Sequence, residues 1–86
     1  MPPQKTVLIT GCSSGIGYDA AHFLTARGWR VFATCRQDSD CARLRDEGLD
    51  SFVLDYADPD SITTALAEVL QRSNGRLDAL YNNGAF

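Results

Sequence analysis

The sequence has few of the residues that several common kinds of site require. It contains one histidine (His22), one lysine (Lys5) and three cysteines that form no CxxC pair. A zinc site needs several Cys or His ligands at characteristic spacings, and a nucleic-acid interface needs a clustered basic face. The 8 basic and 11 acidic side chains give a net charge of −3. We therefore predict no metal site and no nucleic-acid partner, and we expect the cysteines to be free, buried thiols.

Long apolar runs are also missing. No run approaches the ~18 residues that a membrane-spanning helix needs, and residues 1–4 lack the basic and apolar segments of a signal peptide. We therefore expect no membrane partner and a cytoplasmic location. With 44% hydrophobic and 22% charged side chains, the composition is that of one small globular domain over residues 1–86.

Short apolar runs do alternate with amphipathic stretches along the whole chain. The runs are typical of buried strands, and the stretches have the period of helices. The predicted strands are Thr6–Thr10, Arg30–Cys35, Ser51–Leu54 and Leu77–Tyr81. The predicted helices run from Ile16 to a stop at Gly28, from Ser39 to Glu47, and from Asp58-Pro59 to a stop at Asn74-Gly75. This β-α-β-α-β-α-β order predicts an α/β fold, a parallel sheet with helices on both faces.

The helical period also predicts which side chains face the sheet. They are Ile16, Ala20, Phe23 and Leu24 in the first helix, Cys41 and Leu44 in the second, and Ile62, Ala65, Leu66, Val69 and Leu70 in the third. Ser39 or Asp40 is expected to cap the second helix. Asp58 is expected to cap the third helix, with Pro59 in its first turn.

The most informative segment joins the first strand to the first helix and reads Thr10-Gly11-Cys12-Ser13-Ser14-Gly15-Ile16-Gly17. Glycines at such a junction allow a sharp turn, let a pyrophosphate approach the main chain and let the helix pack closely on the sheet. The N–H groups and the positive end of the helix dipole can then hold the anion. Ser13 and Ser14 can add hydroxyl donors, so the turn favours a nucleotide site.

The Gly-x3-Gly-x-Gly spacing of this turn resembles the TGxxxGxG fingerprint of the short-chain dehydrogenase/reductase family. Three later features resemble the same family: Cys35-Arg36 closing the second strand, Asp55 closing the third, and Asn82-Asn83-Gly84-Ala85 after the fourth, with Gly84 and Ala85 in reverse of the usual order. The resemblance covers essentially all 86 residues. It implies the first half of a Rossmann-type fold, with strand order 3-2-1-4 and Asp55 against an adenine ring. The residues assigned to the cofactor are Gly11, Ser13, Ser14, Gly15, Ile16, Gly17, Arg36, Asp55, Asn82 and Gly84.

The end of the second strand bears on which dinucleotide binds. An acidic residue there hydrogen-bonds the ribose 2′-hydroxyl of NAD and repels the 2′-phosphate of NADP. The neutral Cys35 occupies that position here, and the guanidinium of the following Arg36 can clamp a phosphate. We predict a preference for NADP, with NAD as the alternative. The competing interpretation is that Arg36 is a solvated residue paired with Asp38 or Asp40.

Two other motifs overlap the same turn. Gly11–Gly15 matches the GxSxG nucleophile elbow, with Ser13 as nucleophile. However, the only histidine, His22, lies in the very next helix, and too few residues precede Gly11 to form the strands that a hydrolase needs before its elbow. A P-loop requires a lysine directly after its last glycine, and no lysine follows Lys5. Both interpretations are therefore disfavoured.

The resemblance implies hydride transfer between a nicotinamide and a carbonyl or alcohol carbon, assisted by a serine and a YxxxK pair. The residues four positions after the three tyrosines are His22, Asp60 and Ala85, so the chain has no YxxxK. We assign no catalytic residue. We interpret the chain as the cofactor-binding half of an oxidoreductase whose catalytic residues would lie beyond Phe86. The alternative is a genuinely short, non-catalytic nucleotide-binding or interaction module.

The strand order that the resemblance implies would leave the outer edge of the fourth strand uncovered in an 86-residue chain. An uncovered edge is prone to pair with another chain. We therefore predict that the isolated chain is marginally stable or associates with itself through this strand. Sedimentation and thermal denaturation over a range of concentrations test this prediction. A monomer with a sharp, reversible and concentration-independent transition would contradict it.

Overall fold

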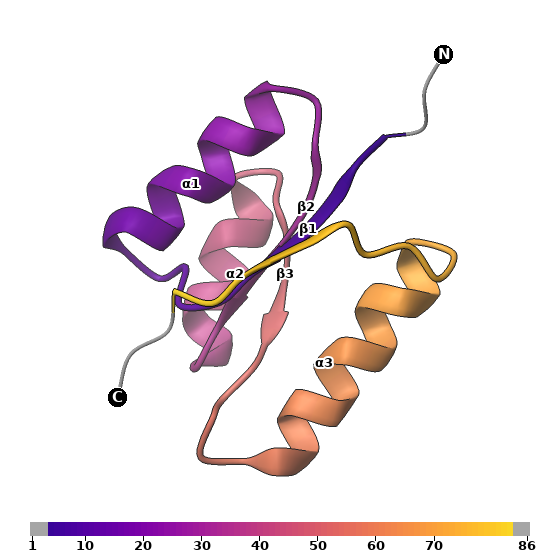
Figure 1. The fold of residues 1–86 in the computed structure, drawn as a ribbon. Helices are drawn as coiled ribbons and strands as arrows, with labels where there is room; N and C mark the ends of the chain where they lie inside the picture. The colour runs from indigo at the N-terminus through magenta and orange to yellow at the C-terminus, as the bar shows by residue number, and fades with distance from the viewer. Residues whose placement is uncertain (1–3, 84–86) are drawn as a thin grey trace.

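The computed structural model describes residues 4–83. Its elements are β1 (Thr6–Ile9), α1 (Gly15–Ala26), β2 (Arg30–Cys35), α2 (Asp38–Asp46), β3 (Asp50–Val53), α3 (Pro59–Arg72) and β4 (Ala79–Tyr81). The strands form one parallel sheet in the order β3-β2-β1-β4. Helices α1 and α2 lie on one side of the sheet and α3 on the other (Figure 1). The predicted α/β fold and strand order are confirmed.

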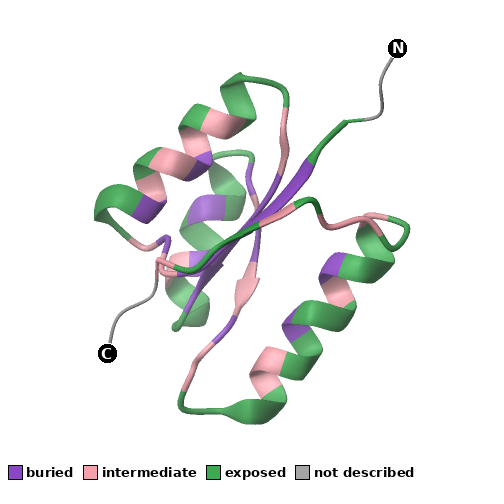
Figure 2. Ribbon diagram, in the orientation of Figure 1, coloured by how far each residue is buried: buried purple, intermediate pink, exposed green. Residues whose placement is uncertain are grey.

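The sheet separates two apolar clusters. Ile9 of β1 belongs to the cluster beneath α1 and α2, together with Ala21 and Leu44. Its neighbour Leu8 belongs to the cluster beneath α3, together with Val69. Consecutive residues of a strand point to opposite faces, so β1 is buried on both sides, as its continuous apolar run predicts. Figure 2 shows this burial concentrated in the central strands.

The inner face of α1 differs from the predicted one. Gly17 and Ala21 are buried, whereas Ile16 and Phe23 are 69% and 56% exposed. The prediction is wrong for these two large residues, whereas Ala20 and Leu24 pack against the core as predicted. The helix turns the side with Gly17 and Ala21 to the sheet, and it lies so close to the end of β1 that its first turn has no room for a side chain at Gly17.

The start of α2 also differs from the prediction. Asp38 is its first residue, and Gln37 stands at the N-cap without a side-chain capping bond. Neither Ser39 nor Asp40 caps the helix. The carboxylates of Asp38 and Asp40 instead pair with arginines of the same helix, and they therefore do not bind the backbone N–H groups of the first turn.

Helix α3 begins as predicted. The Asp58 side chain accepts a hydrogen bond from the backbone N–H of Asp60, and Pro59 stands in the first turn. Of the five residues expected to face the sheet, Ala65 and Val69 are buried, and both leucines of that stripe are exposed. The apolar stripe of α3 is therefore wider than the part of the helix that packs against the sheet.

The last two strands are shifted or shortened. β3 begins at Asp50, one residue before the predicted start, and β4 covers Ala79–Tyr81 rather than 77–81. β4 pairs with β1 along one edge, and Leu80 is 59% exposed. Among residues 4–83, no helix has both the length and the hydropathy of a membrane span.

A carboxylate just before β4 fastens it to the start of β1. Asp78 Oδ2 accepts a hydrogen bond from Arg76 Nε at 2.8 Å and from the backbone N–H of Thr6 at 2.7 Å. The Thr6 carbonyl accepts the N–H of Asp78 in return at 3.0 Å. The bond from Arg76, followed by that from Thr6, holds the pKa of Asp78 below its ordinary value.

Replacing Asp78 by Asn should destabilise the fold in a pH-dependent way. A carboxylate whose pKa is lower in the folded state adds stability above its unfolded pKa of about 3.9 and loses it as the pH falls through the folded value. Urea denaturation should therefore find D78N less stable than the wild type at pH 7, with the difference vanishing at strongly acidic pH. The control is D46N, since Asp46 makes no ion pair within the described part of the chain. A pH-independent difference for D78N would contradict the linkage.

Candidate functional site

The glycine-rich turn lies at the carboxyl end of β1, a central strand of the sheet, where the chain passes into α1 (Figure 1). Gly11 and Gly15 have positive φ angles of 68° and 67°. Residues with a Cβ atom rarely adopt such angles. These two positions therefore let the chain turn from the strand into the helix without backbone strain.

Gly17 is needed because the chain packs closely around it. A Cβ atom at this position would lie 2.5 Å from the carbonyl oxygen of Gly11 and 2.5 Å from the side-chain nitrogen of Asn83. The same Asn83 nitrogen donates a hydrogen bond to the Gly11 oxygen at 3.2 Å. The first turn of α1 is thereby packed against both the loop and the segment that follows β4.

The N-terminus of α1 offers free backbone donors. Ser14 is the N-cap, with an extended backbone and no side-chain capping bond, and the first turn contains no acidic residue. The first N–H groups of any α-helix lack partners within the helix. Ser14, Gly15 and Ile16 are all exposed. This end of α1 therefore has the donors and the dipole to hold a phosphate group.

Side chains that follow three different strands meet beside the turn. The Tyr56 hydroxyl bonds Thr10 Oγ1 at 2.7 Å and also the side-chain oxygen of Asn82. The Thr10 hydroxyl donates to the same Asn82 oxygen at 3.2 Å. This network joins the carboxyl ends of β1, β3 and β4. Neither Tyr56 nor the side-chain role of Thr10 is indicated by the sequence motifs, and the positions of these residues just after strands are the one signal for them in the sequence.

Asp55 is engaged in the loop that leads from β3 to α3. Its Oδ1 accepts the backbone N–H of Ala57 at 3.0 Å. The hydroxyl of Ser61 contacts both the backbone N–H and the carbonyl of Asp55, at 2.9 and 3.1 Å. The second carboxylate oxygen makes no hydrogen bond with any residue that the structure describes. Asp55 thus stabilises its own loop and keeps one acceptor available.

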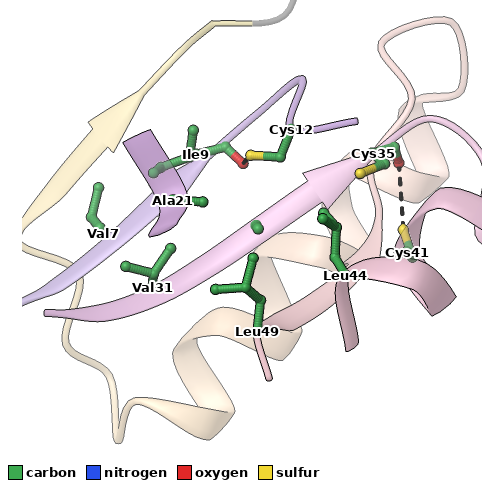
Figure 3. Close-up of a cluster of buried hydrophobic side chains, with 10 residues drawn as sticks. Val7, Ile9, Cys12, Ala21, Val31, Cys35, Cys41, Leu44 and Leu49 are labelled. Atoms are coloured by element: carbon green, nitrogen blue, oxygen red, sulfur yellow. Dashed lines mark hydrogen bonds between the residues drawn. The ribbon is translucent and has the colours of Figure 1, made fainter. Parts of the chain in front are cut away.

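The three cysteines lie in the core beneath the turn. Cys12, Cys35 and Cys41 are free and buried, as predicted, and Figure 3 shows them in the cluster that also contains Leu44. Burial raises the pKa of Cys12 and of Cys35 to about 12, with nearby Cys41 adding to the effect. The thiols of Cys12 and Cys35 therefore remain neutral at neutral pH. No group of three metal-ligating side chains occurs among residues 4–83.

Arg36 is exposed, whereas the preceding Cys35 is buried. It lies at the end of β2 and makes no ion pair with any described residue. Asp38 and Asp40 pair instead with Arg45 at 3.7 Å and Arg43 at 3.6 Å. The exposure of Arg36 agrees with the competing interpretation, but the pairing of Arg36 with one of these aspartates does not occur among residues 4–83.

The predicted site residues that the structure describes lie where parallel strands end. The six in the turn follow β1, Arg36 follows β2, Asp55 follows β3 and Asn82 follows β4. Gly84 lies outside the described residues. In open parallel sheets, ligands bind outside the carboxyl ends of the strands, where neighbouring strands connect in opposite directions. β1 is such a point, because the chain leads from it to β2 on one side, and β4 lies on the other.

Comparison with known proteins bears on what this site binds. A family model described as short chain dehydrogenase matches residues 5–86. The chain is 40% identical over 83 residues to an oxidoreductase of Escherichia coli, YbbO, covering 96% of this chain and 31% of that protein. It is 42% identical over 84 residues to the NADPH-dependent 1-acyldihydroxyacetone phosphate reductase of Schizosaccharomyces pombe, covering 96% and 28%. The chain thus spans about a third of the length of these relatives.

The same likeness holds among solved structures. The chain superimposes on a polyketide ketoreductase of actinorhodin synthesis, crystallised with NADPH, with a TM-score of 0.81 and 30% identity. The match covers 96% of this chain and 34% of that one. A menthone neomenthol reductase of Mentha piperita gives a TM-score of 0.85 at 26% identity, covering 99% and 33%.

Substituting Ala for Gly17 tests the close packing around the turn. Alanine in a helix normally stabilises it by about 1 kcal/mol relative to glycine, whereas overpacking costs about 1–3 kcal/mol. Because the added carbon would meet a backbone carbonyl, we expect G17A to lower the free energy of unfolding, measured by urea denaturation. The comparison variant is G48A, because Gly48 has a φ of 92° and no atom lies within 4 Å of the position of an added Cβ. G48A therefore introduces backbone strain without a steric contact, and G17A introduces the steric contact. A more stable G17A protein would contradict the packing.

Proposed function

The chain belongs to the short-chain dehydrogenase family, and from this premise we propose that the whole protein is an NADP-preferring oxidoreductase whose residues 1–86 bind the dinucleotide. When bound, the nicotinamide supplies the hydride that passes to or from a carbonyl or alcohol carbon. The catalytic serine, tyrosine and lysine of the family have no counterparts in the 86 residues. The role proposed for this part of the protein is therefore to hold and select the cofactor. The relatives are named as oxidoreductases and reductases, which favours an enzyme over a non-catalytic module.

The geometry of the turn fits a pyrophosphate. The positive φ angles of Gly11 and Gly15 and the missing Cβ of Gly17 leave the main chain open to close approach. The uncapped N-terminus of α1 supplies N–H donors and a favourable dipole. In this proposal the hydroxyl groups of Ser13 and Ser14 add donors to the phosphate oxygens. Asp55 and Asn82 stand on the adenine side.

The availability of Arg36 is the observation that carries the preference for NADP. Its guanidinium is exposed at the end of β2, and no carboxylate in the described part of the chain neutralises it. A guanidinium in that state can bind a phosphate through two parallel, charge-assisted hydrogen bonds. The preceding Cys35 is buried and neutral, so no negative charge at the strand end repels the 2′-phosphate. The NADPH named for one relative and for one structural neighbour supports the same choice.

Replacing Arg36 by Ala should weaken NADP binding and leave NAD binding unchanged. A hydrogen bond to a charged group contributes about 1.5–3 kcal/mol, which corresponds to a roughly 10- to 100-fold rise in the Kd for NADP. Calorimetric titration of both dinucleotides into the protein at its natural length measures this. R27A is the matched control, because Arg27 is an exposed arginine that lies over the Phe23 ring at the opposite end of α1.

Two results would contradict the proposal. One is a wild-type protein that binds NAD more tightly than NADP. The other is an R36A protein whose affinity for NADP equals that of R27A.

A further inference from the structure

A charged side chain from α2 contacts the glycine-rich turn. Arg43 Nη2 donates a hydrogen bond to the carbonyl oxygen of Ser13 at 2.6 Å, although the two residues lie 30 positions apart. The backbone N–H of Cys12 is bonded to the Thr34 carbonyl at 2.9 Å. The turn is thus attached to β2 through Cys12 and to α2 through Ser13. No turn or capping motif in the sequence indicates the second attachment.

The Arg43 guanidinium is held in place by its surroundings. Asp40, one turn earlier on α2, lies 3.6 Å from it, and Glu47, the C-cap residue of α2, lies 3.8 Å from it. Its centre also lies 5.8 Å from the centre of the Tyr18 ring on α1. A planar guanidinium fixed on several sides is pre-organised, so it loses little conformational freedom when it bonds the Ser13 carbonyl.

Glu47 links this arginine to α1. Its Oε1 accepts the Tyr18 hydroxyl at 2.7 Å and contacts His22 Nε2 at 2.7 Å. The Tyr18 and His22 rings pack edge to face, with their centres 4.8 Å apart. The bonds from Tyr18 and His22 hold the pKa of Glu47 below its ordinary value. Glu47 therefore stays anionic at neutral pH, and the guanidinium keeps a charged partner.

The orientation of the Ser13 carbonyl fixes the peptide group that follows it. The peptide is planar and trans, because the described residues contain no cis bond, so its C=O and N–H point in opposite directions. With the Ser13 oxygen turned toward α2, the N–H of Ser14 points away from α2. Ser14 is the N-cap of α1, and its N–H has no partner among residues 4–83. This donor therefore stays available at the exposed N-cap of the helix.

We propose that Arg43 is a positioning residue for the bound dinucleotide, which fixes the Ser13–Ser14 peptide so that the Ser14 N–H meets the pyrophosphate. This inference rests on the proposed function, because it requires a dinucleotide at the turn. Arg43 acts through the backbone and does not touch the cofactor. The pyrophosphate is common to NADP and NAD, so loss of Arg43 affects both. The 2′-phosphate that is assigned to Arg36 belongs to NADP alone.

The test compares R43Q with R45Q in the protein at its natural length, by calorimetric titration of NADP and of NAD. R45Q removes the same charge from the same helix, but Arg45 contacts Ser51 and Asp38 instead of the turn. We expect R43Q to weaken both dinucleotides roughly tenfold, with the ratio of the two affinities unchanged, and R45Q to weaken neither. The loss should persist at 0.5 M salt (about a 4 Å screening length), because it arises from a misplaced donor rather than a distant charge.

A second variant, R43K, shows whether weaker binding by R43Q results from loss of the folded structure. R43K keeps the charge and one donor but lacks the planar fork, so it should fold and bind both dinucleotides roughly threefold more weakly than the wild type. R43Q and R43K proteins that bind both dinucleotides as tightly as the wild type would overturn the inference alone. A loss confined to NADP would also overturn it, because it would make Arg43 a direct ligand of the 2′-phosphate. A wild-type protein that binds neither dinucleotide would overturn the proposed function as well.

Discussion

The carbonyl oxygen of Gly11 lies 2.5 Å from the point that a Cβ atom of Gly17 would occupy. This close approach sets the position of α1 on the sheet, and with it most of the site. It keeps the N-terminal turn of α1 directly beyond the end of β1. It also leaves no room for a side chain at Gly17, so the face of α1 that packs on the sheet runs through Gly17, Ala21 and Leu24, and Ile16 and Phe23 are exposed. One pair of backbone positions therefore shapes both the candidate phosphate site and the packing of the first turn of the helix.

The polar groups of the site follow from the strand order. β1 stands between β2 and β4, so the chain leaves it toward one side and returns on the other. At the carboxyl ends of these strands the side chains of Thr10, Asn82 and Tyr56 bond one another. Because each of these residues follows a different strand, the network fixes the spacing of the strand ends without adding secondary structure. The buried strands lie behind this network, and the loops in front carry the polar groups of the candidate site.

The sequence reveals much of the fold because most of its elements depend on local patterns. Apolar runs locate the strands to within one or two residues, and Asp58-Pro59 locates the start of α3, since its cap lies within three residues. The errors have two causes. The inner face of α1 depends on the approach of Gly17 to the loop at Gly11 and to the distant Asn83. The capping of α2 fails because its aspartates pair with arginines of the same helix, a choice between two local partners that the sequence pattern does not decide. For the site, motif spacing finds the glycines and Arg36, whereas the contact of Arg43 with Ser13 joins residues 30 positions apart and has no local signature.

The proposed dinucleotide site lies in a segment whose own net charge is negative. The net charge of −3 of these 86 residues does not attract a dinucleotide that carries several phosphate charges, so the proposed function relies on local donors at the turn. Two arginines stand near the turn in different electrostatic states. Arg43 is surrounded by Asp40 and Glu47, which offset its charge and leave it mainly a source of directed hydrogen bonds. Arg36 has no such partner in the described chain, and the proposed function assigns its charge to the 2′-phosphate of NADP. The same residue type can therefore serve orientation at one position and phosphate selection at the other, because carboxylates surround only one of them.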